Sequence, residues 1–306
     1  MTPNPRAYGS PTAVESAIKA AAKKVSAEDH AVSVSERIRR EHFRRFLTRV
    51  FLDAEDSGWV LKGGTSILAR IPAARATTDV DLLWEGSELD GALAELRRLV
   101  EEDIGDYFRF SYRGHRPLTG KEQQARVEGY QVGFDTYLGA KKVGSFHVDL
   151  VVGSLITAPP QLLEPAGALR LPRLPSAPYR LYPVVDQVAD KVCATLAVYS
   201  GSESSRERDL VDLVVLATTD DFDAARLNEA ILKEAQHRLT QLPPKFTVPR
   251  KWGAGYMKAA KGVPACLAFP TVREALDLMA VFLDPILQGH VSEGHWSHDQ
   301  LQWSTD

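Results

Sequence analysis

The pattern of the chain changes near its middle, and this change limits what it can fold into. Between residues 58 and 153, short apolar stretches with strand-like alternation are interspersed with amphipathic helical patterns. A proline-rich connector follows over residues 158–183, and from residue 184 to about 287 the pattern is mainly helical. This order predicts an α+β chain in which a mixed sheet with flanking helices is followed by a helical domain.

The same pattern divides the 306 residues into four parts. Three prolines in the first 12 residues indicate a loose leader, and alanine-rich helical sequence follows it. We expect a leader and first helix over 1–35 and a sheet-bearing core over 36–175. A helical domain over 176–290 would complete the active site, and a polar, mobile tail would occupy 291–306.

The composition excludes several classes of protein. A hydrophobic content of 44% with 25% charged residues is typical of a globular protein. The net charge of -3 gives no overall attraction to nucleic acid, so a polyanionic partner would have to meet local positive patches. No apolar run approaches the roughly 18 residues of a membrane span. Because Cys193 and Cys266 stand far apart in sequence, we expect no disulfide framework and a cytoplasmic location.

Two aspartates stand in the strand-like stretch TDVDLLW, where Asp79 and Asp81 are separated by one valine. Alternation on a strand would place both carboxylates on one face, and buried carboxylates need a nearby cation. Mg²⁺ is commonly held by one or two carboxylates together with substrate phosphates. Asp149, in FHVDLVV, would add a third strand acid and suit two metal ions. The alternative is an ordinary turn with two exposed strand acids.

A glycine pair precedes this acid pair in KGGTSIL. Gly63 and Gly64 allow a turn without Cβ atoms, so their N–H groups can face a phosphate. Thr65 and Ser66 would then open a helix, where hydroxyls and free N–H groups favour anions. The sequence therefore predicts nucleotide-phosphate contacts at these four residues.

Charged residues also stand on the inward faces of two later helical stretches. Lys191 lies beside the apolar face of VVDQVADKVCATLAVY and could reach a triphosphate. In SSRERDLVDLVVLA, Asp209 and Asp212 share a helical face and need a cation such as Lys191. Arg206 stands at the start of this helix, where the helix dipole disfavours a cation unless a phosphate or an acid is near. A purely structural lysine–aspartate pair is the alternative.

Positive charge gathers in one later segment, although the chain is acidic overall. Residues 235–273 contain seven Lys or Arg and no Asp or Glu. The candidate RNA contacts in this segment are Arg250, Lys251, Lys258 and Lys261, interleaved with Phe246, Trp252 and Tyr256. Such a mixture suits a phosphate backbone with stacking on unpaired bases. In the alternative, the aromatic residues pack in the core.

Four blocks in this order, KGGTSIL…RATTDVDLL, HVDLVV, ADKVCA and RERDLVDL, resemble the AbiEii/AbiGii-type nucleotidyltransferase toxins. This family includes the MenT toxins and belongs to the DNA polymerase β-like nucleotidyltransferase superfamily. The blocks span residues 62–213. The resemblance implies a polymerase β-like core and Mg²⁺-dependent transfer of a nucleoside monophosphate from an NTP, with release of pyrophosphate.

The resemblance also implies roles for individual residues. The glycine pair and Thr65 would lie at the nucleotide phosphates, and Asp79 and Asp81 would be Mg²⁺ ligands. Lys191 would contact the nucleotide together with Arg206 and Asp212, and Asp209 would act beside them as a base or an orienting group. Arg75 and Thr77 match the basic and hydroxyl positions before the acid pair, and in some MenT relatives this hydroxyl is phosphorylated by the antitoxin. The resemblance also carries Asp149 over as a third metal ligand.

The family resemblance indicates the acceptor and the partner. Its tRNA-directed members favour addition of a pyrimidine nucleotide to the tRNA 3′ end, and a cognate antitoxin, AbiEi-like or of another type, is expected. Transfer to a protein or small-molecule hydroxyl is one alternative. A non-catalytic module that binds a nucleotide or an antitoxin is another. The sequence leaves the oligomeric state open.

Overall fold

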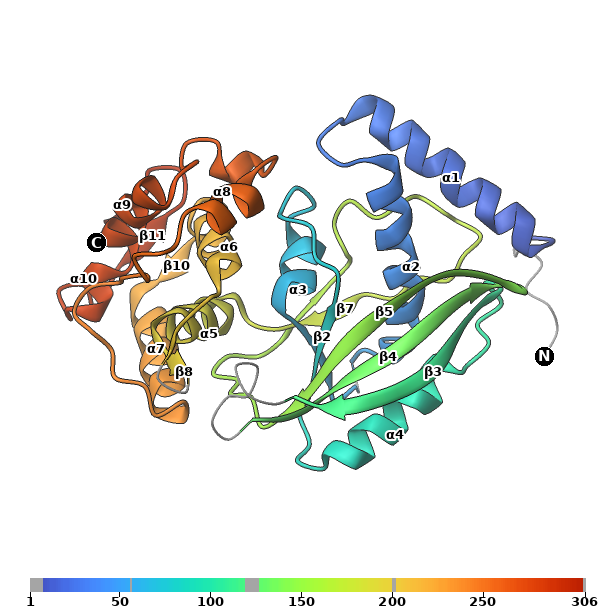
Figure 1. The fold of residues 1–306 in the computed structure, drawn as a ribbon, viewed down its shortest axis with the longest axis horizontal. Helices are drawn as coiled ribbons and strands as arrows, with labels where there is room; N and C mark the ends of the chain where they lie inside the picture. The colour runs from blue at the N-terminus through green and yellow to red at the C-terminus, as the bar shows by residue number, and fades with distance from the viewer. Residues whose placement is uncertain (1–7, 56, 119–126, 200–201, 305–306) are drawn as a thin grey trace.

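The computed structural model describes residues 8–55, 57–118, 127–199 and 202–304. Figure 1 shows a sheet-bearing part and a helical part, with one short helix between them. The sheet-bearing part contains helices α1 (Pro11–Glu28), α2 (Val34–Val50) and α4 (Leu89–Val100), and the short helix between the parts is α3 (Gly63–Arg70). A mixed sheet followed by helices is the predicted α+β order.

Seven strands form the main sheet in the order β3-β4-β5-β2-β1-β7-β6. Their bounds are β1 Trp59–Lys62, β2 Val80–Trp84, β3 Phe108–Pro117, β4 Glu128–Leu138, β5 Lys141–Val152, β6 Gln161–Leu163 and β7 Tyr179–Leu181. β2 pairs in parallel with β5, and β1 with β7, while the other neighbouring pairs are antiparallel. β6 and β7 come from the proline-rich connector, which the sequence had indicated only as a link between the two parts.

The two faces of this sheet have different neighbours. Leu82 of β2 and Leu150 of β5 belong to the main core, together with Phe46 of α2. Successive side chains of a strand point to opposite faces, so Asp81 and Asp149 project away from this core. The acids of the central strands are therefore available to the helical part of the molecule.

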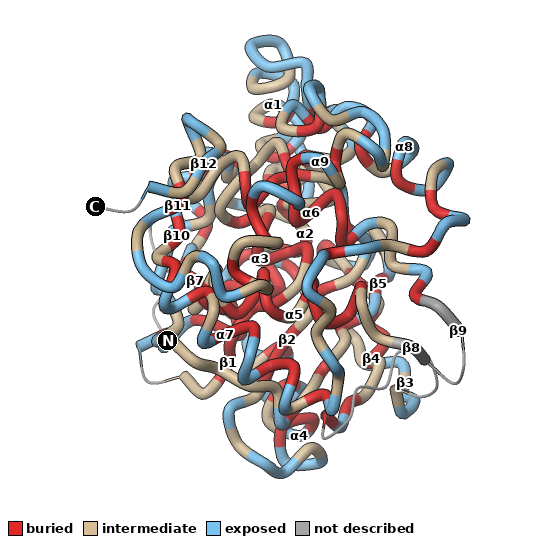
Figure 2. The backbone as a smooth tube through the Cα atoms, turned by 90° about the vertical axis from the view of Figure 1, so that its left-hand side faces the viewer, coloured by how far each residue is buried: buried red, intermediate tan, exposed pale blue. Residues whose placement is uncertain are grey.

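The helical part has its own core. Its helices are α5 (Val184–Leu196), α6 (Glu207–Ala217), α7 (Ala224–His237), α8 (Ala254–Ala260), η2 (Pro264–Cys266), α9 (Val272–Phe282) and α10 (Asp284–Leu287), and β8 (Val198–Tyr199) pairs with β9 (Ser202–Glu203). Ile67 of α3 joins this second core, so α3 links the two parts. Figure 2 shows buried backbone gathered around α3, α5 and α6. Within the described ranges, no helix is long and apolar enough to cross a membrane.

The C-terminal residues form a hairpin, which corrects one expectation. β11 (His295–Ser297) pairs with β12 (Gln302–Ser304) and with β10 (Phe222–Asp223). Trp296 is fully buried, lies 4.7 Å from Phe282 between ring centroids, and donates a hydrogen bond to the carbonyl of Ala217 at 2.7 Å. The expected mobile tail is therefore wrong for residues 295–304, because burial of an indole with its N–H satisfied offsets the entropy of ordering the segment.

Two helix starts follow directly from local sequence. Ser33 caps α2, and its hydroxyl accepts a hydrogen bond from the backbone N–H of Glu36 at 3.2 Å. Ser10 caps α1 in the same way through the N–H of Ala13. Both caps satisfy N–H groups that have no partner inside the helix.

Candidate functional site

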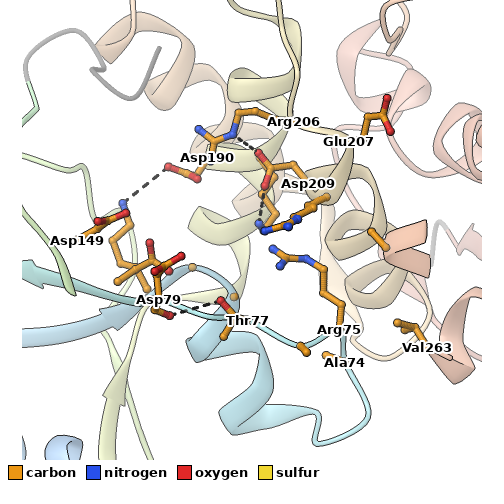
Figure 3. A pocket seen from close by; sticks show the side chains of 18 of the residues that line it. Ala74, Arg75, Thr77, Asp79, Asp149, Asp190, Arg206, Glu207, Asp209 and Val263 are labelled. Carbon is orange, nitrogen blue, oxygen red and sulfur yellow. Dashed lines mark hydrogen bonds and ion pairs between the residues drawn. The ribbon is translucent and has the colours of Figure 1, made fainter. Parts of the chain in front are cut away.

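A cavity of about 1330 Å³ lies where the sheet, α3 and the helical part meet. The sheet side of its wall includes Asp81 and Asp149, and the helical side includes Lys191 and Asp209. Figure 3 shows Asp79 and Asp149 on one side of this space, facing Arg206 and Asp209 on the other. Residues from blocks that are more than 100 positions apart in the sequence thus line one space.

The acid pair lies at the start of β2. Asp79 stands immediately before the strand and Asp81 is its second residue. Asp81 pairs in register with Asp149 of β5, so the two carboxylates lie on the same face of neighbouring strands. Burial, and then the negative charge of Asp149, raise the pKa of Asp81 to about 7. This pair of acids is therefore poised to be stabilised by a cation.

The two glycines bring the start of α3 close to these acids. Gly63 has a φ of +60°, and a Cβ there would lie 2.5 Å from Cγ of Asp81 and closer still to Oδ2. The side-chain amide of Gln187 donates to the carbonyl of Gly63 at 3.0 Å, which ties this turn to α5. Only a residue without a Cβ leaves room for the Asp81 carboxylate.

A cluster of cations and acids lies on the helical side of the cavity. The Lys191 ammonium donates to Asp209 Oδ1 at 3.1 Å and to Asp212 Oδ2 at 2.6 Å. Arg75 binds Asp212 in a bidentate manner at 2.6 and 2.8 Å, and Arg206 lies 2.5 Å from Asp209 Oδ2. Three cations and two carboxylates therefore form one network.

Charge states in this network follow from the neighbours. Burial disfavours the charged form of Lys191, but Asp209 and Asp212 outweigh burial, and the net result is a raised pKa. Burial opposes ionisation of Asp209 as well, yet Arg206 and Lys191 outweigh it and lower its pKa. Lys191 is therefore an ammonium and Asp209 a carboxylate at neutral pH. An aspartate of lowered pKa suits an orienting role better than that of a general base.

Comparison with known families agrees with this arrangement. Residues 45–280 match a family model described as nucleotidyl transferase AbiEii toxin, type IV TA system. The chain belongs to the AbiEii family. It is therefore a nucleotidyltransferase of a toxin–antitoxin type, as the sequence resemblance implied.

Two solved Helicobacter pylori structures are similar to this AbiEii chain at 15% identity and over 82% of its length. One is JHP933, of which 92% is covered with a TM-score of 0.40. The other is a candidate nucleotidyltransferase, of which 96% is covered with a TM-score of 0.42. These scores are too low to add weight to the assignment. No match is found among curated proteins.

Three residues expected at the nucleotide lie behind the cavity wall. Thr65 and Ser66 are buried within α3, and the Thr65 hydroxyl donates to the carbonyl of Asp79 at 2.8 Å. Asp212 is buried under Arg75 and Lys191. In this AbiEii chain Thr65 fixes the turn that carries the acids, and Asp212 orients Arg75 and Lys191.

Thr77 lies at the wall of the cavity. Its hydroxyl donates to the carbonyl of Asp79 at 3.4 Å, and a Cβ on Gly64 would lie 3.3 Å from the hydroxyl oxygen. Any group attached to this hydroxyl would therefore stand between the glycine turn and the acids.

Besides Lys191, a second lysine lines the cavity, and the sequence analysis did not identify it. Lys62 is almost completely buried, lines the cavity and pairs in register with Asp81. Its ammonium donates to Ser154 Oγ at 3.0 Å and lies 3.7 Å from Asp190 Oδ1, which also accepts from Arg238 at 2.6 Å. The sequence shows Lys62 next to the glycine pair, but only strand pairing reveals that it faces Asp81.

The aromatic residues of the positive segment are core residues, so the expected stacking surface is wrong. Phe246, Trp252 and Tyr256 are all buried. The indole of Trp252 donates to the carbonyl of Ser204 at 3.0 Å, and the Tyr256 hydroxyl donates to that of Phe269 at 2.6 Å. All three side chains belong to the core of the helical part.

The four candidate RNA contacts of that segment divide into two pairs. Lys258 and Lys261 are exposed and line the cavity. Arg250 and Lys251 are exposed and lie outside the cavity wall. The segment therefore offers positive charge both at the cavity and beside it.

The carboxylates fit Mg²⁺ bound together with a substrate. In the described part of the chain, no group of three or more His, Cys, Asp or Glu side chains is gathered so as to hold a metal ion by itself. Asp79 and Asp81 supply hard oxygen donors from one short stretch, and Mg²⁺ typically takes one or two carboxylates and completes its shell with phosphates and water. The donor set therefore suits a metal site that is completed by a nucleotide.

Proposed function

We propose that this AbiEii-family enzyme transfers a nucleoside monophosphate from an NTP, with a pyrimidine base, to the 3′-terminal hydroxyl of tRNA in the cytoplasm. The observation that carries the proposal is the meeting of two unlike groups in one cavity. Asp79 and Asp81 approach from the sheet, and Lys191 and Arg206 approach from the helical part. A metal-bound triphosphate needs both groups, because carboxylates hold the metal and cations hold the phosphate oxygens.

The proposed reaction is an in-line displacement. The acceptor hydroxyl oxygen forms a bond to the α-phosphorus, its proton passes to solvent water, and the bond to the bridging oxygen breaks to release pyrophosphate. One or two Mg²⁺ ions, when bound, would neutralise charge that develops on the phosphate oxygens. Asp79 and Asp81 would hold the metal, with Asp149 as a further ligand. The N–H groups of Gly63 and Gly64 would face the phosphates.

The cation network would position the donor nucleotide. Lys191 and Arg206 line the cavity, and both are oriented by Asp209. Asp212 holds Arg75 and Lys191 from behind. Because these cations are already fixed by carboxylates, little side-chain entropy would be lost when a triphosphate binds.

The size and charge of the cavity support a large anionic acceptor. Small-molecule pockets usually enclose about 300–1000 Å³, and this cavity of about 1330 Å³ is larger. It can therefore accommodate a nucleotide and the end of a second molecule. Lys258 and Lys261 at its wall, with Arg250 and Lys251 nearby, would attract a phosphate backbone.

The family implies an antitoxin partner, because it consists of toxins of type IV toxin–antitoxin systems. We propose that silencing acts at Thr77. A phosphate on this hydroxyl would carry about two negative charges into the space beside Gly64 and Asp79. It would repel both the acids and the donor triphosphate.

The test is incubation of the protein with Mg²⁺, total tRNA and each labelled NTP in turn. Label on tRNA with one nucleotide supports the proposal and identifies the donor. Asp79→Ala should abolish the label, whereas Asp53→Ala, at an exposed acid outside the cavity, should preserve it. Label that appears only on protein or on small hydroxyl compounds would show that the acceptor is one of these and not tRNA. Thermal stabilisation by an NTP without any product would indicate a binding module.

A further inference from the structure

Five polar residues form one row across five adjacent strands. Arg116 of β3 pairs with Gln131 of β4, and Gln131 pairs with Asp149 of β5. Asp149 pairs with Asp81 of β2, and Asp81 pairs with Lys62 of β1. Residues paired across strands project from the same face of the sheet, so the row faces the cavity side as a unit.

Hydrogen bonds run along the outer half of this row. Arg116 donates to Gln131 Oε1 from Nη2 at 3.0 Å and from Nε at 3.2 Å. The side-chain amide of Gln131 donates to Asp149 Oδ1 at 3.1 Å. Because a guanidinium can only donate, the amide oxygen must face Arg116 and the NH₂ group must face Asp149. The arginine therefore determines which way the amide points.

We propose that Gln131 and Arg116 are positioning residues that hold Asp149 in place as a ligand for a divalent cation shared with Asp81. This inference rests on the proposed function, which places the metal at the acid pair. Asp81 and Asp149 project side by side from neighbouring strands, and their like charges favour rotation of the Asp149 carboxylate away from Asp81. The hydrogen bond from the Gln131 amide to Asp149 Oδ1 restricts this rotation.

The alternative is that the row only stabilises the sheet. Arg116 is exposed, and exposed polar pairs contribute little to folding free energy. On the same strand, Arg113 lies 3.6 Å from Asp135 and stands outside the row, so it offers a matched control. Gln302, an exposed glutamine of β12, is the control for the amide.

The experiment measures Mn²⁺ binding by the full chain, alone and with an NTP, with the free Mn²⁺ signal in electron paramagnetic resonance as readout and the NTP without protein as the blank. We expect Gln131→Met to weaken binding about tenfold or more, the size of effect seen when support for a metal ligand is lost. Arg116→Met should weaken binding by a smaller factor, because it only frees the amide to turn. Arg113→Met and Gln302→Met should bind Mn²⁺ as the wild type does, and thermal melting of all four variants checks that each is folded.

Kinetics provide a second readout. With Gln131→Met, the KM for Mg²⁺ should rise while kcat at saturating Mg²⁺ stays near that of the wild type. Wild-type Mn²⁺ affinity in a folded Gln131→Met variant would overturn this inference and leave the proposed function intact. Absence of Mn²⁺ binding by the wild type, both alone and with an NTP present, would overturn both, because there would be no ion for Asp149 to hold.

Discussion

The Asp81 carboxylate occupies the space that a side chain on Gly63 would need. A Cβ on Gly63 would lie 2.5 Å from Cγ of Asp81, and the backbone there has a φ of +60°. The glycine turn and the acid strand are thus one steric unit. Any residue other than glycine would have to displace a proposed metal ligand.

Gly63→Ala is therefore expected to abolish nucleotidyl transfer and to lower stability by about 1–2 kcal/mol from the left-handed backbone alone. The clash with Asp81 would add to this cost. Gly144→Ala is the control, because no heavy atom lies within 4 Å of its Cβ position and its φ is not in the left-handed region. Transfer assays and urea denaturation of both variants check the prediction. Wild-type activity in Gly63→Ala would show that the Asp81 carboxylate can move without loss of nucleotidyl transfer.

Lys191 holds two buried carboxylates, so its removal should be costly. Lys191→Met removes one cation from Asp209 and Asp212, while the ion pairs to Arg206 and Arg75 remain. We expect a loss of about 3 kcal/mol in unfolding free energy, the lower end for a broken buried ion pair, and no detectable transfer. Lys233→Met, at an exposed pair, should cost less than about 0.5 kcal/mol. Equal stability of the two variants would contradict the buried network.

Lys62 should contribute to nucleotide affinity. It lines the cavity on the strand next to that of Asp81, with which it pairs in register, and its ammonium is 3.7 Å from Asp190. We expect Lys62→Met to raise the KM for the NTP about tenfold, because one cation near the phosphates is lost. Lys142→Met, on an exposed part of β5, is the control. An unchanged KM would assign Lys62 a purely structural role.

Lys258 of α8 and Lys261, which follows the end of α8, should bind the acceptor and leave the fold unaffected. A Lys258→Met, Lys261→Met double variant is expected to raise the KM for tRNA several-fold and to reduce its salt dependence, since fewer phosphate contacts release counterions. Its melting temperature should match the wild type because both side chains are exposed. Trp252→Ala should instead lower stability by about 3–5 kcal/mol, as for a core tryptophan. Lys245→Met serves as the control for loss of one exposed charge.

Stability should fall on acidification through His42. Burial lowers the pKa of its imidazole from 6.5 to about 4, while the charge of Glu15 acts in the opposite direction. Because the folded pKa is below the unfolded one, the unfolded chain binds the proton first, so stability is retained above pH 6.5 and lost between pH 6.5 and 4. The loss should be about 3 kcal/mol relative to His42→Gln. Urea denaturation of the wild type and of His42→Gln at pH 7 and pH 4.5 measures this loss. An equal change in unfolding free energy in the two proteins would refute the prediction.

Local patterns were sufficient for much of the fold. The cap at Ser33 depends only on Glu36 three residues later, and apolar alternation around Asp81 and Asp149 indicated two strands with their acids on one side. These features depend on neighbours within a few residues, which a sequence displays directly. The strands of the proline-rich connector and the C-terminal hairpin around Trp296 were missed, because each forms only against partners far away in the sequence.

By itself, the sequence determined the residue types of the site and the family to which the chain belongs. Only the tertiary structure decided which of these residues share the cavity. It placed Lys62 beside Asp81 and Gln131 beside Asp149, and it buried Thr65 behind the residues that line the cavity. The physical reason is that strand register and helix packing bring together side chains that no local periodicity relates, and burial then sets which of them are charged.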